Sequence, residues 1–428
     1  MKHLVLIALI VLFLSTANYM YAAVVKSMWQ EGVIPGAEHE YEAIAGLWLV
    51  TIPSIIAIIF SIPMGILADK LGKTKILVVM CLLMSIGLFL VGTSQGLSML
   101  TIGFSLFTLG MMGAYPAVMG IIADTTPEER RGTGYAVYYA STAIGYPLGL
   151  IIGLLLAWRT GYSVLGALVL VFTPIAFTII EKTYKTLPGR TVKSREYKAK
   201  GALKTITTPA IIALFILIFF WGMPWGAITR YAVNFLMDAW GVSKGTATII
   251  LTLSSISIII GHIMGGLLAD RRVKKGDVLG RVKISILGVT IGILVMLSFV
   301  LYPYPFGREE LAILLPPAIL ALAGMMFTTL AYPNISSVLS EVTKQEYRAT
   351  VFAVFNILNN LGWGLGPTLY GLLKDHYYTV LSPSLSHQEA IAVASKYSIT
   401  TIVLLWLIPL VIWIIMLKLY PKSRIIES

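Results

Sequence analysis

Long apolar runs separated by short polar segments fill the sequence. The runs cover residues 4–25, 43–67, 76–93, 97–122, 133–157, 162–180, 209–236, 246–269, 283–301, 311–339, 349–373 and 398–419. A helix of about 20 apolar residues crosses the hydrocarbon of a bilayer, and lipid offers no partner to unpaired backbone groups. The pattern therefore predicts an all-α membrane protein with twelve transmembrane helices.

Composition supports this prediction. Of 428 residues, 57% are hydrophobic and 12% are charged, whereas a soluble domain averages about 25% charged residues. This excludes a soluble fold, a disordered chain, a coiled coil and a nucleic-acid-binding protein. The single cysteine, Cys81, excludes a disulfide framework. There is no P-loop, no G-x-S-x-G element and no metal-ligand spacing, so we expect no enzyme, no cofactor and no metal.

The first run has two interpretations. Lys2 precedes the apolar stretch 4–14, and Tyr21-Ala22-Ala23 resembles a cleavage site, as in a signal peptide. An even helix count and a two-half repeat both need this run, so a retained first helix is favoured.

Basic residues are distributed unevenly between alternate loops. If the N-terminus lies inside, inner segments carry 25 of the 32 Lys and Arg residues. Cytoplasmic loops of membrane proteins are enriched in these residues. The net charge of +12 therefore reflects topology, and it predicts a multi-pass plasma-membrane protein with both termini in the cytoplasm.

The longest inner segment divides the helices six and six. We expect an N-terminal bundle over 1–180, a basic cytoplasmic linker over 181–208 and a C-terminal bundle over 209–428. The linker is interpreted as a topological anchor, with binding of anionic lipid headgroups as an alternative.

An internal repeat relates the two halves. Ala114-Tyr115-Pro116 recurs as Ala331-Tyr332-Pro333, 217 positions later, and this offset also relates Asp124 to Glu341, Arg131 to Arg348 and Gly145 to Gly362. The segment 65–69 matches 266–270 at an offset of 201. The chain is thus predicted to consist of two homologous six-helix halves in the same orientation.

With this repeat in place, the chain resembles the major facilitator superfamily. The segment Gly65-Ile66-Leu67-Ala68-Asp69-Lys70-Leu71-Gly72-Lys73 matches the G-x-L-A-D-[R/K]-x-G-[R/K] signature that follows the second helix in that superfamily, and a weaker copy begins at Gly266. The resemblance covers nearly the whole chain. It implies the major facilitator fold and a transporter working by alternating access.

The resemblance also implies a cytoplasmic gate. The acid of each motif would dock against the opposite half, and the motif base would pair with the acid that ends helix four or ten. We expect Asp69 near Arg348, Lys73 with Asp124, Asp270 near Arg131, and Lys274 with Glu341. The alternative is a purely topological role for these charges.

In this superfamily helices one, four, seven and ten line the cavity, with contributions from their neighbours. The matching polar and aromatic side chains are Asn18, Tyr21, Tyr115, Tyr139, Trp225, Arg230, Tyr332, Asn356, Asn360 and Trp363. The alternatives are interfacial aromatic belts and Asn side chains that join helices. Arg230 either extends to the outer surface or binds an anionic group.

The coupling mechanism stays open between symport, antiport and uniport. The acids fall at helix ends or in loops, which argues against a simple carboxylate proton carrier. His262 is a candidate proton site, with a hydrogen-bonded packing histidine as the alternative.

The leading hypothesis is a secondary active transporter of a small organic solute, monomeric in the bilayer, with H⁺ as a candidate coupling ion. The alternative is a transporter-like membrane sensor or receptor without net transport.

Overall fold

The computed structural model describes residues 2–125, 131–185, 199–344 and 347–425, and every regular element in these ranges is a helix. The chain divides into two compact units, residues 1–194 and 195–428. This division falls inside the predicted linker. We call the units the N-terminal half and the C-terminal half and describe each by itself.

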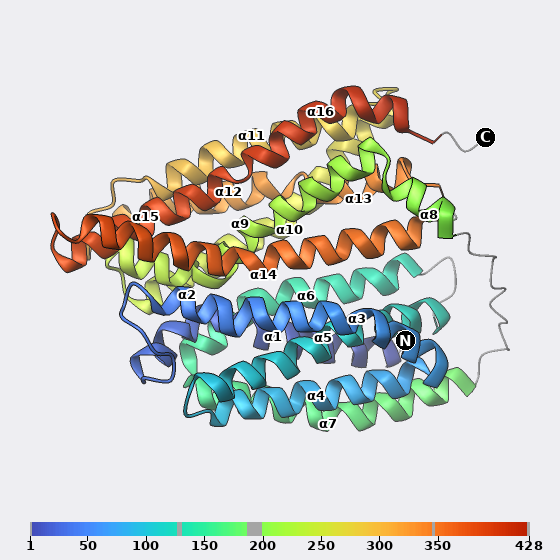
Figure 1. The fold of residues 1–428 in the computed structure, drawn as a ribbon, viewed down its shortest axis with the longest axis horizontal. Coiled ribbons are helices and arrows are strands. Elements are labelled where there is room, and N and C mark those ends of the chain that lie inside the picture. Colours follow the sequence, from blue (N-terminus) through green and yellow to red (C-terminus); the bar gives the residue numbers. More distant parts are fainter. Residues whose placement is uncertain (1, 126–130, 186–198, 345–346, 426–428) are drawn as a thin grey trace. The chain divides into compact units, whose positions relative to one another are not determined.

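Six spans make up the N-terminal half, the blue to green helices in Figure 1. Its elements are α1 (Lys2–Gln30), α2 (Tyr41–Ala45), the π-helix η1 (Gly46–Thr51), α3 (Ile52–Leu71), α4 (Lys73–Thr93), α5 (Leu97–Thr125), α6 (Arg131–Leu155) and α7 (Trp158–Lys185). The run 43–67 is thus one span built from α2, η1 and α3.

Six further spans make up the C-terminal half. Its elements are α8 (Ala199–Ile206), α9 (Pro209–Trp240), α10 (Lys244–Lys274), α11 (Gly280–Val300), α12 (Leu311–Thr329), α13 (Tyr332–Glu341), α14 (Arg348–Leu381), α15 (His387–Leu404) and α16 (Leu407–Ser423). The pairs α12–α13 and α15–α16 each form one span. Of the predicted linker, α7 reaches Lys185 and α8 begins at Ala199, while 186–198 lie outside the described residues.

Eleven described spans are apolar enough to cross a membrane by length and hydropathy. The twelfth, α14, has 34 residues and is long enough at about 1.5 Å per residue. Its central part carries Asn356, Asn359 and Asn360, which lower its hydropathy. The twelve-helix prediction is therefore confirmed, and the most polar span is one that was expected to line the transport path.

Within each half, glycines let one helix pair approach closely. In the C-terminal half, a methyl group added at Gly362 or Gly366 of α14 would overlap backbone carbonyl oxygens of α9. In the N-terminal half, Gly145 and Gly149 of α6 lie in the same way against α1. Since these glycines are related by the 217-residue offset, the repeat preserves a packing contact as well as a sequence pattern.

The second Ala-Tyr-Pro copy breaks its helix, whereas the first does not. Pro116 lies within the continuous α5, but α12 ends at Thr329 and Pro333 lies in the first turn of α13. Proline lacks the N–H that would bond to the preceding turn. The side-chain amide of Asn334, fully buried, donates to the Leu330 carbonyl at 3.1 Å and to the Gly265 carbonyl at 3.4 Å. Asn334 thus satisfies the backbone at the break.

Candidate translocation site

Each half has two ends at which charged groups gather. The linker end holds the turns between α3 and α4 and between α10 and α11. The far end holds the loop after α1 and the loop between α11 and α12.

An ion pair joins α4 and α5 at the linker end of the N-terminal half. Gly72 has φ = +101°, a backbone conformation that glycine adopts without strain, and it ends α3 so that Lys73 begins α4. Lys73 Nζ lies 2.6 Å from Asp124 Oδ2, with the side chains 26% and 33% exposed. The Lys73 stem lies against Gly120 of α5. The predicted Lys73–Asp124 pairing is therefore present.

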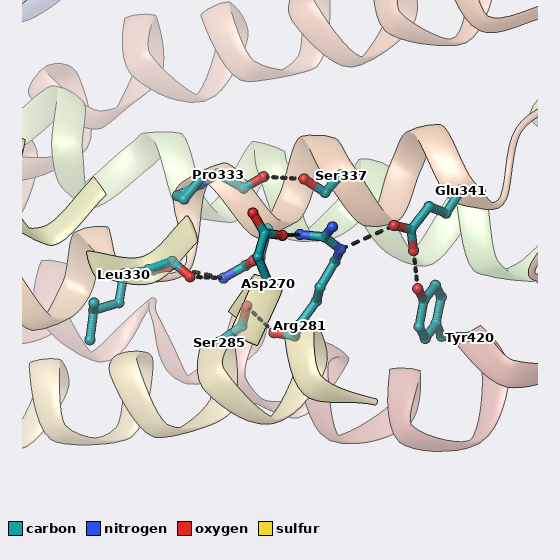
Figure 2. Close-up of polar contacts among 10 residues, drawn as sticks. Asp270, Arg281, Ser285, Leu330, Pro333, Ser337, Glu341 and Tyr420 are labelled. Carbon is teal, nitrogen blue, oxygen red and sulfur yellow. Dashed lines mark hydrogen bonds and ion pairs between the residues drawn. The ribbon is translucent and has the colours of Figure 1, made fainter. Parts of the chain in front are cut away.

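A larger cluster occupies the linker end of the C-terminal half (Figure 2). Arg281, near the start of α11, contacts Asp270 Oδ1 at 2.9 Å and Glu341 Oε1 at 3.0 Å. The Tyr420 hydroxyl of α16 donates to the other oxygen of Glu341. The backbone N–H of Ile425 also donates to the Glu341 carbonyl at 2.9 Å. The cluster therefore ties α10, α11, α13 and α16 together.

This cluster corrects the predicted pairing of Lys274 with Glu341. Helix α10 continues through Lys274, which is exposed on its last turn. The base that begins the next helix, as Lys73 does in the N-terminal half, is Arg281. The second turn is longer, so the motif alignment by an offset of 201 loses register after Asp270.

The remaining predicted gate residues are Arg348, Asp69 and Arg131. Within its own half, Arg348 Nε donates to the Ser340 and Thr343 carbonyls, both at 3.3 Å, and so caps the end of α13. The side chains of Asp69 and Arg131 lie outside the described residues. The predicted contacts between the halves, and the gate role of this set, stay predictions.

A polar stripe runs along α14. Asn356 is exposed. The side-chain amide of Asn360 donates to the backbone carbonyl of Asn356 at 2.8 Å and to the side-chain oxygen of Asn356 at 3.2 Å. One turn further on, the backbone of Trp363 lies against Gly226 of α9. The stripe thus presents two amides beside a helix crossing.

Two predicted cavity aromatics of this half have different surroundings. Trp225 is buried, and its ring centroid lies 5.7 Å from that of Trp406, so it packs against α15–α16. Tyr332 is 36% exposed, and its ring lies 5.3 Å from the half-buried ring of His262 on α10. Arg230 is half-buried on α9. A cavity role for these residues, and proton binding by His262, stay predictions.

Tyrosines cluster on α5 and α6 of the N-terminal half. The Tyr138 ring lies 5.8 Å from that of Tyr115 and 5.3 Å from that of Tyr139, and Tyr139 is 56% exposed. On α1, Asn18 is half-buried, whereas Tyr21 is fully buried against Phe104 of α5. Tyr115, Tyr139 and Asn18 therefore keep accessible surface, while Tyr21 packs in the interior.

Two acids are buried inside spans, which the sequence pattern missed. Glu42 in α2 is fully buried and accepts a hydrogen bond from the Tyr41 hydroxyl at 3.3 Å. Asp238, near the end of α9, contacts Lys374 of α14 at 2.7 Å, and neither side chain is exposed by more than 1%. Both acids lie near helix ends, as predicted, and their burial there is not visible in the sequence pattern. Asp238 and Lys374 are 136 positions apart, so no local pattern pairs them.

The far end of the N-terminal half carries ion pairs that are more exposed. Arg159, at the start of α7, lies 3.3 Å from Glu31, with 38% and 46% of the side chains exposed. The indole of Trp158 donates to Glu31 at 2.8 Å. Lys26 of α1 pairs with Glu38 at 3.1 Å.

Comparisons with known proteins agree with this architecture. An "MFS-type efflux pump" of Mycolicibacterium smegmatis is 25% identical over 277 residues, 62% of this chain and 61% of that protein. A "Probable galactarate/D-glucarate transporter GarP" of Escherichia coli (strain K12) is 21% identical over 407 residues, 87% and 89% of the two chains.

Among solved structures, a bacterial homologue of the human lysosomal transporter Spinster, inward-facing and unoccupied, has a TM-score of 0.78 at 16% identity, covering 100% and 98% of the two chains. The peptide transporter POT in complex with sulfate has a TM-score of 0.71 at 16% identity, covering 99% and 96%. At this identity the likeness shows the fold alone. A model of the Major Facilitator Superfamily matches residues 5–367, and the chain belongs to that family of membrane transporters.

Proposed function

We propose that this protein is a secondary active transporter that moves a small organic solute across the plasma membrane by alternating access of its two halves, with both termini in the cytoplasm. The observation that carries the proposal is the acid–base cluster that recurs at the linker end of both halves. Lys73–Asp124 and Arg281–Glu341 each join the third span of a half to its fourth.

These clusters support a gate because their geometry is polar and only partly buried. The Lys73–Asp124 pair, with a quarter to a third of each side chain exposed, contributes about 0–1 kcal/mol to stability, which suits a contact that forms and breaks in each cycle. The 25 bases of the predicted inner segments support a cytoplasmic location for these clusters.

The described lining favours a neutral or amphipathic solute. Exposed and half-buried amides and tyrosines, such as Asn356, Asn360 and Tyr139, offer hydrogen bonds and ring faces. Intramembrane polar groups of this kind usually face a substrate path rather than lipid. Arg230 adds a cation that would accept an anionic group on the solute.

Uptake into proteoliposomes tests the proposal. The purified chain is screened with radiolabelled sugars, sugar acids, amino acids and amphipathic drugs, with and without an imposed pH gradient. Lys73→Gln should lower the rate of uptake at unchanged folding. Lys75→Gln, an exposed base of the same turn, is the matched control and should not. Uptake of none of the classes would contradict transport, and a ligand-dependent binding partner would then favour a sensor.

A further inference from the structure

The break between α12 and α13 leaves one polar atom without a partner deep inside the C-terminal half. Asn334 is fully buried. Its side-chain nitrogen donates to the Leu330 carbonyl at 3.1 Å and to the Gly265 carbonyl at 3.4 Å. No group in the described part of the chain donates to its side-chain oxygen, Oδ1. Since a buried polar atom without a hydrogen bond is costly, this oxygen is expected to have a further ligand.

The orientation of this amide follows from its two neighbours. Both contacts of the Asn334 nitrogen are backbone carbonyl oxygens, which only accept hydrogen bonds. The hydrogen-bond network decides how an asparagine amide is turned, and the opposite orientation would place Oδ1 against both carbonyls. The atom without a partner is therefore the oxygen, so its ligand is either a hydrogen-bond donor or a cation.

Other oxygen atoms lie at the same break. A helical carbonyl points along the helix toward the N–H four residues on, and for Thr329 that residue is Pro333, which has no N–H. The Leu330 carbonyl lies directly against the backbone of Gly265 on α10. The Thr329 hydroxyl lies in the same way against Gly261 and donates its hydrogen back to its own helix. The break is therefore rich in oxygens whose lone pairs can bind a ligand.

The electrostatics of the break favour a cation. The C-terminus of α12 carries the negative end of a helix dipole. The positive end of α13 is partly neutralised, because the backbone N–H groups of Asn334 and Ile335 both donate to the Ala331 carbonyl, at 3.1 and 3.2 Å. The sequence has no Lys or Arg in 245–270 or in 309–343. No basic side chain of α10, α12 or α13 near the break therefore competes for its oxygens.

We propose that the break between α12 and α13 is a sodium-binding site, with Asn334 Oδ1 and the carbonyl oxygens of Thr329 and Leu330 as ligands. In transporters of other folds, backbone carbonyls freed where a helix is interrupted coordinate Na⁺. Ca²⁺ and Mg²⁺ are usually held by carboxylates, whereas these ligands are neutral oxygens and suit a monovalent ion. Bound Na⁺ stabilises the C-terminal half whether or not a solute is moved, so the site goes beyond the proposed function.

The N-terminal half provides an internal comparison. The Ala-Tyr-Pro triplet also occurs in α5, but Ala117 stands there in the place of Asn334. Helix α5 continues through Pro116 without a break. The first copy therefore lacks both the side-chain oxygen and the interrupted helix, and the repeat does not predict a second sodium site at this position of α5.

The test measures the melting temperature of the purified full chain in detergent, as choline chloride is replaced by NaCl or KCl at constant ionic strength. A ligand that binds only the folded state raises the melting temperature as its concentration increases. We expect a saturable rise of several degrees in NaCl and a smaller one in KCl. Asn334→Leu removes the oxygen at similar side-chain size and should abolish the rise. Asn359→Leu is the matched control and should keep it, because Asn359 also has a buried amide oxygen without a described partner but lies within the continuous α14.

Asn334→Asp covers the case in which Asn334→Leu fails to fold. A carboxylate keeps an oxygen ligand and adds attraction for a cation, so the NaCl concentration at half the rise should fall several-fold. An unchanged midpoint in Asn334→Asp, or a wild-type rise in Asn334→Leu, overturns the proposal. Equal wild-type melting temperatures in NaCl and choline chloride, the result expected if water binds Oδ1, also overturn it, and so does a saturable rise in KCl alone. Because no readout requires transport, a failure here is distinct from a failure of the uptake screen.

Discussion

Replacing Arg281 with glutamine removes the guanidinium that contacts both Asp270 and Glu341. The contact to Glu341 is the less exposed, with 16% of the arginine and 28% of the glutamate side chain accessible. A hydrogen bond between charged groups contributes about 1.5–3 kcal/mol to stability. The contact to Asp270, which is 50% exposed, adds at most about 1 kcal/mol. Since glutamine keeps some hydrogen bonding, we expect Arg281→Gln to cost about 2 kcal/mol.

The equivalent change in the other half should cost less. Among the described residues of its half, Lys73 forms an ion pair with Asp124 only, and both side chains are a quarter to a third exposed. Lys73→Gln should therefore cost about 0.5–1 kcal/mol. Lys283, two residues after Arg281, pairs with Asp277 at the surface, with 44% and 29% exposed. Lys283→Gln is the matched control for the C-terminal half.

The assay is the free energy of unfolding in mixed detergent micelles, followed by circular dichroism. A double-mutant cycle with Glu341→Gln isolates the Arg281–Glu341 interaction. Two results would refute the reasoning: equal losses for Arg281→Gln and Lys283→Gln, or a coupling energy near zero. Either would mean that the cluster in Figure 2 is solvated like an ordinary surface pair.

Two further predictions concern the same half. Hydrogen bonds from the Thr246 hydroxyl and the Ser243 backbone N–H hold the pKa of Glu309 below its usual 4.5. The ionised Glu309 therefore stabilises the fold at any pH above 4.5, and this stabilisation is lost as the pH falls through the lower pKa of the folded state. The melting-temperature difference between wild type and Glu309→Gln should therefore be constant above about pH 5 and shrink below it; a difference that persists in acid would contradict this. Gly265→Ala should cost about 1–3 kcal/mol, because its methyl group would overlap the Leu330 carbonyl oxygen, whereas nothing lies within 4 Å of one at Gly266. Equal unfolding free energies for Gly265→Ala and Gly266→Ala would refute the close packing.

The sequence predicted the spans well because bilayer thickness imposes a length and a hydropathy on each. It did not predict how spans are interrupted. The break before Pro333 depends on Asn334, whose side-chain amide donates a hydrogen bond to the Gly265 carbonyl on α10. The break has no counterpart at Pro116, although both prolines lie in the same Ala-Tyr-Pro triplet. The triplet is the same at the two sites, but Ala117 follows it in α5 and Asn334 follows it in α13, so the residue after the triplet and its contact with another helix decide.

The candidate site was predictable where residues recur near the start or end of a helix. Lys73 and Asp124 were paired correctly because a motif and a repeat both pointed to them. The predicted pairing of Lys274 with Glu341 was wrong because the turn between α10 and α11 is longer than the turn between α3 and α4. The offset of 201 residues therefore no longer aligns equivalent positions after Asp270. Tyr420 was missed because a tyrosine near the end of an apolar run is usual at a membrane interface, and only the fold brings it to Glu341.

The two halves share a framework and differ in charge burial. The glycine crossings at Gly145 and Gly362 are equivalent, so the helix pairs that carry them are positioned alike. On this common framework two ion pairs of the N-terminal half, Lys73–Asp124 and Glu31–Arg159, have at least a quarter of each side chain exposed. The C-terminal half instead shields a bridged cluster and a fully buried pair.

Burial makes the energy of an ion pair depend strongly on protonation and on its partner. In this transporter, the conformational energy of the C-terminal half should therefore respond more strongly to a change in charge than that of the N-terminal half. The stored free-energy difference between conformations should then reside mainly in the C-terminal half. Neutralising Arg281 should change the conformational equilibrium more than neutralising Lys73, although each base begins the third span of its half and contacts the acid near the end of the fourth.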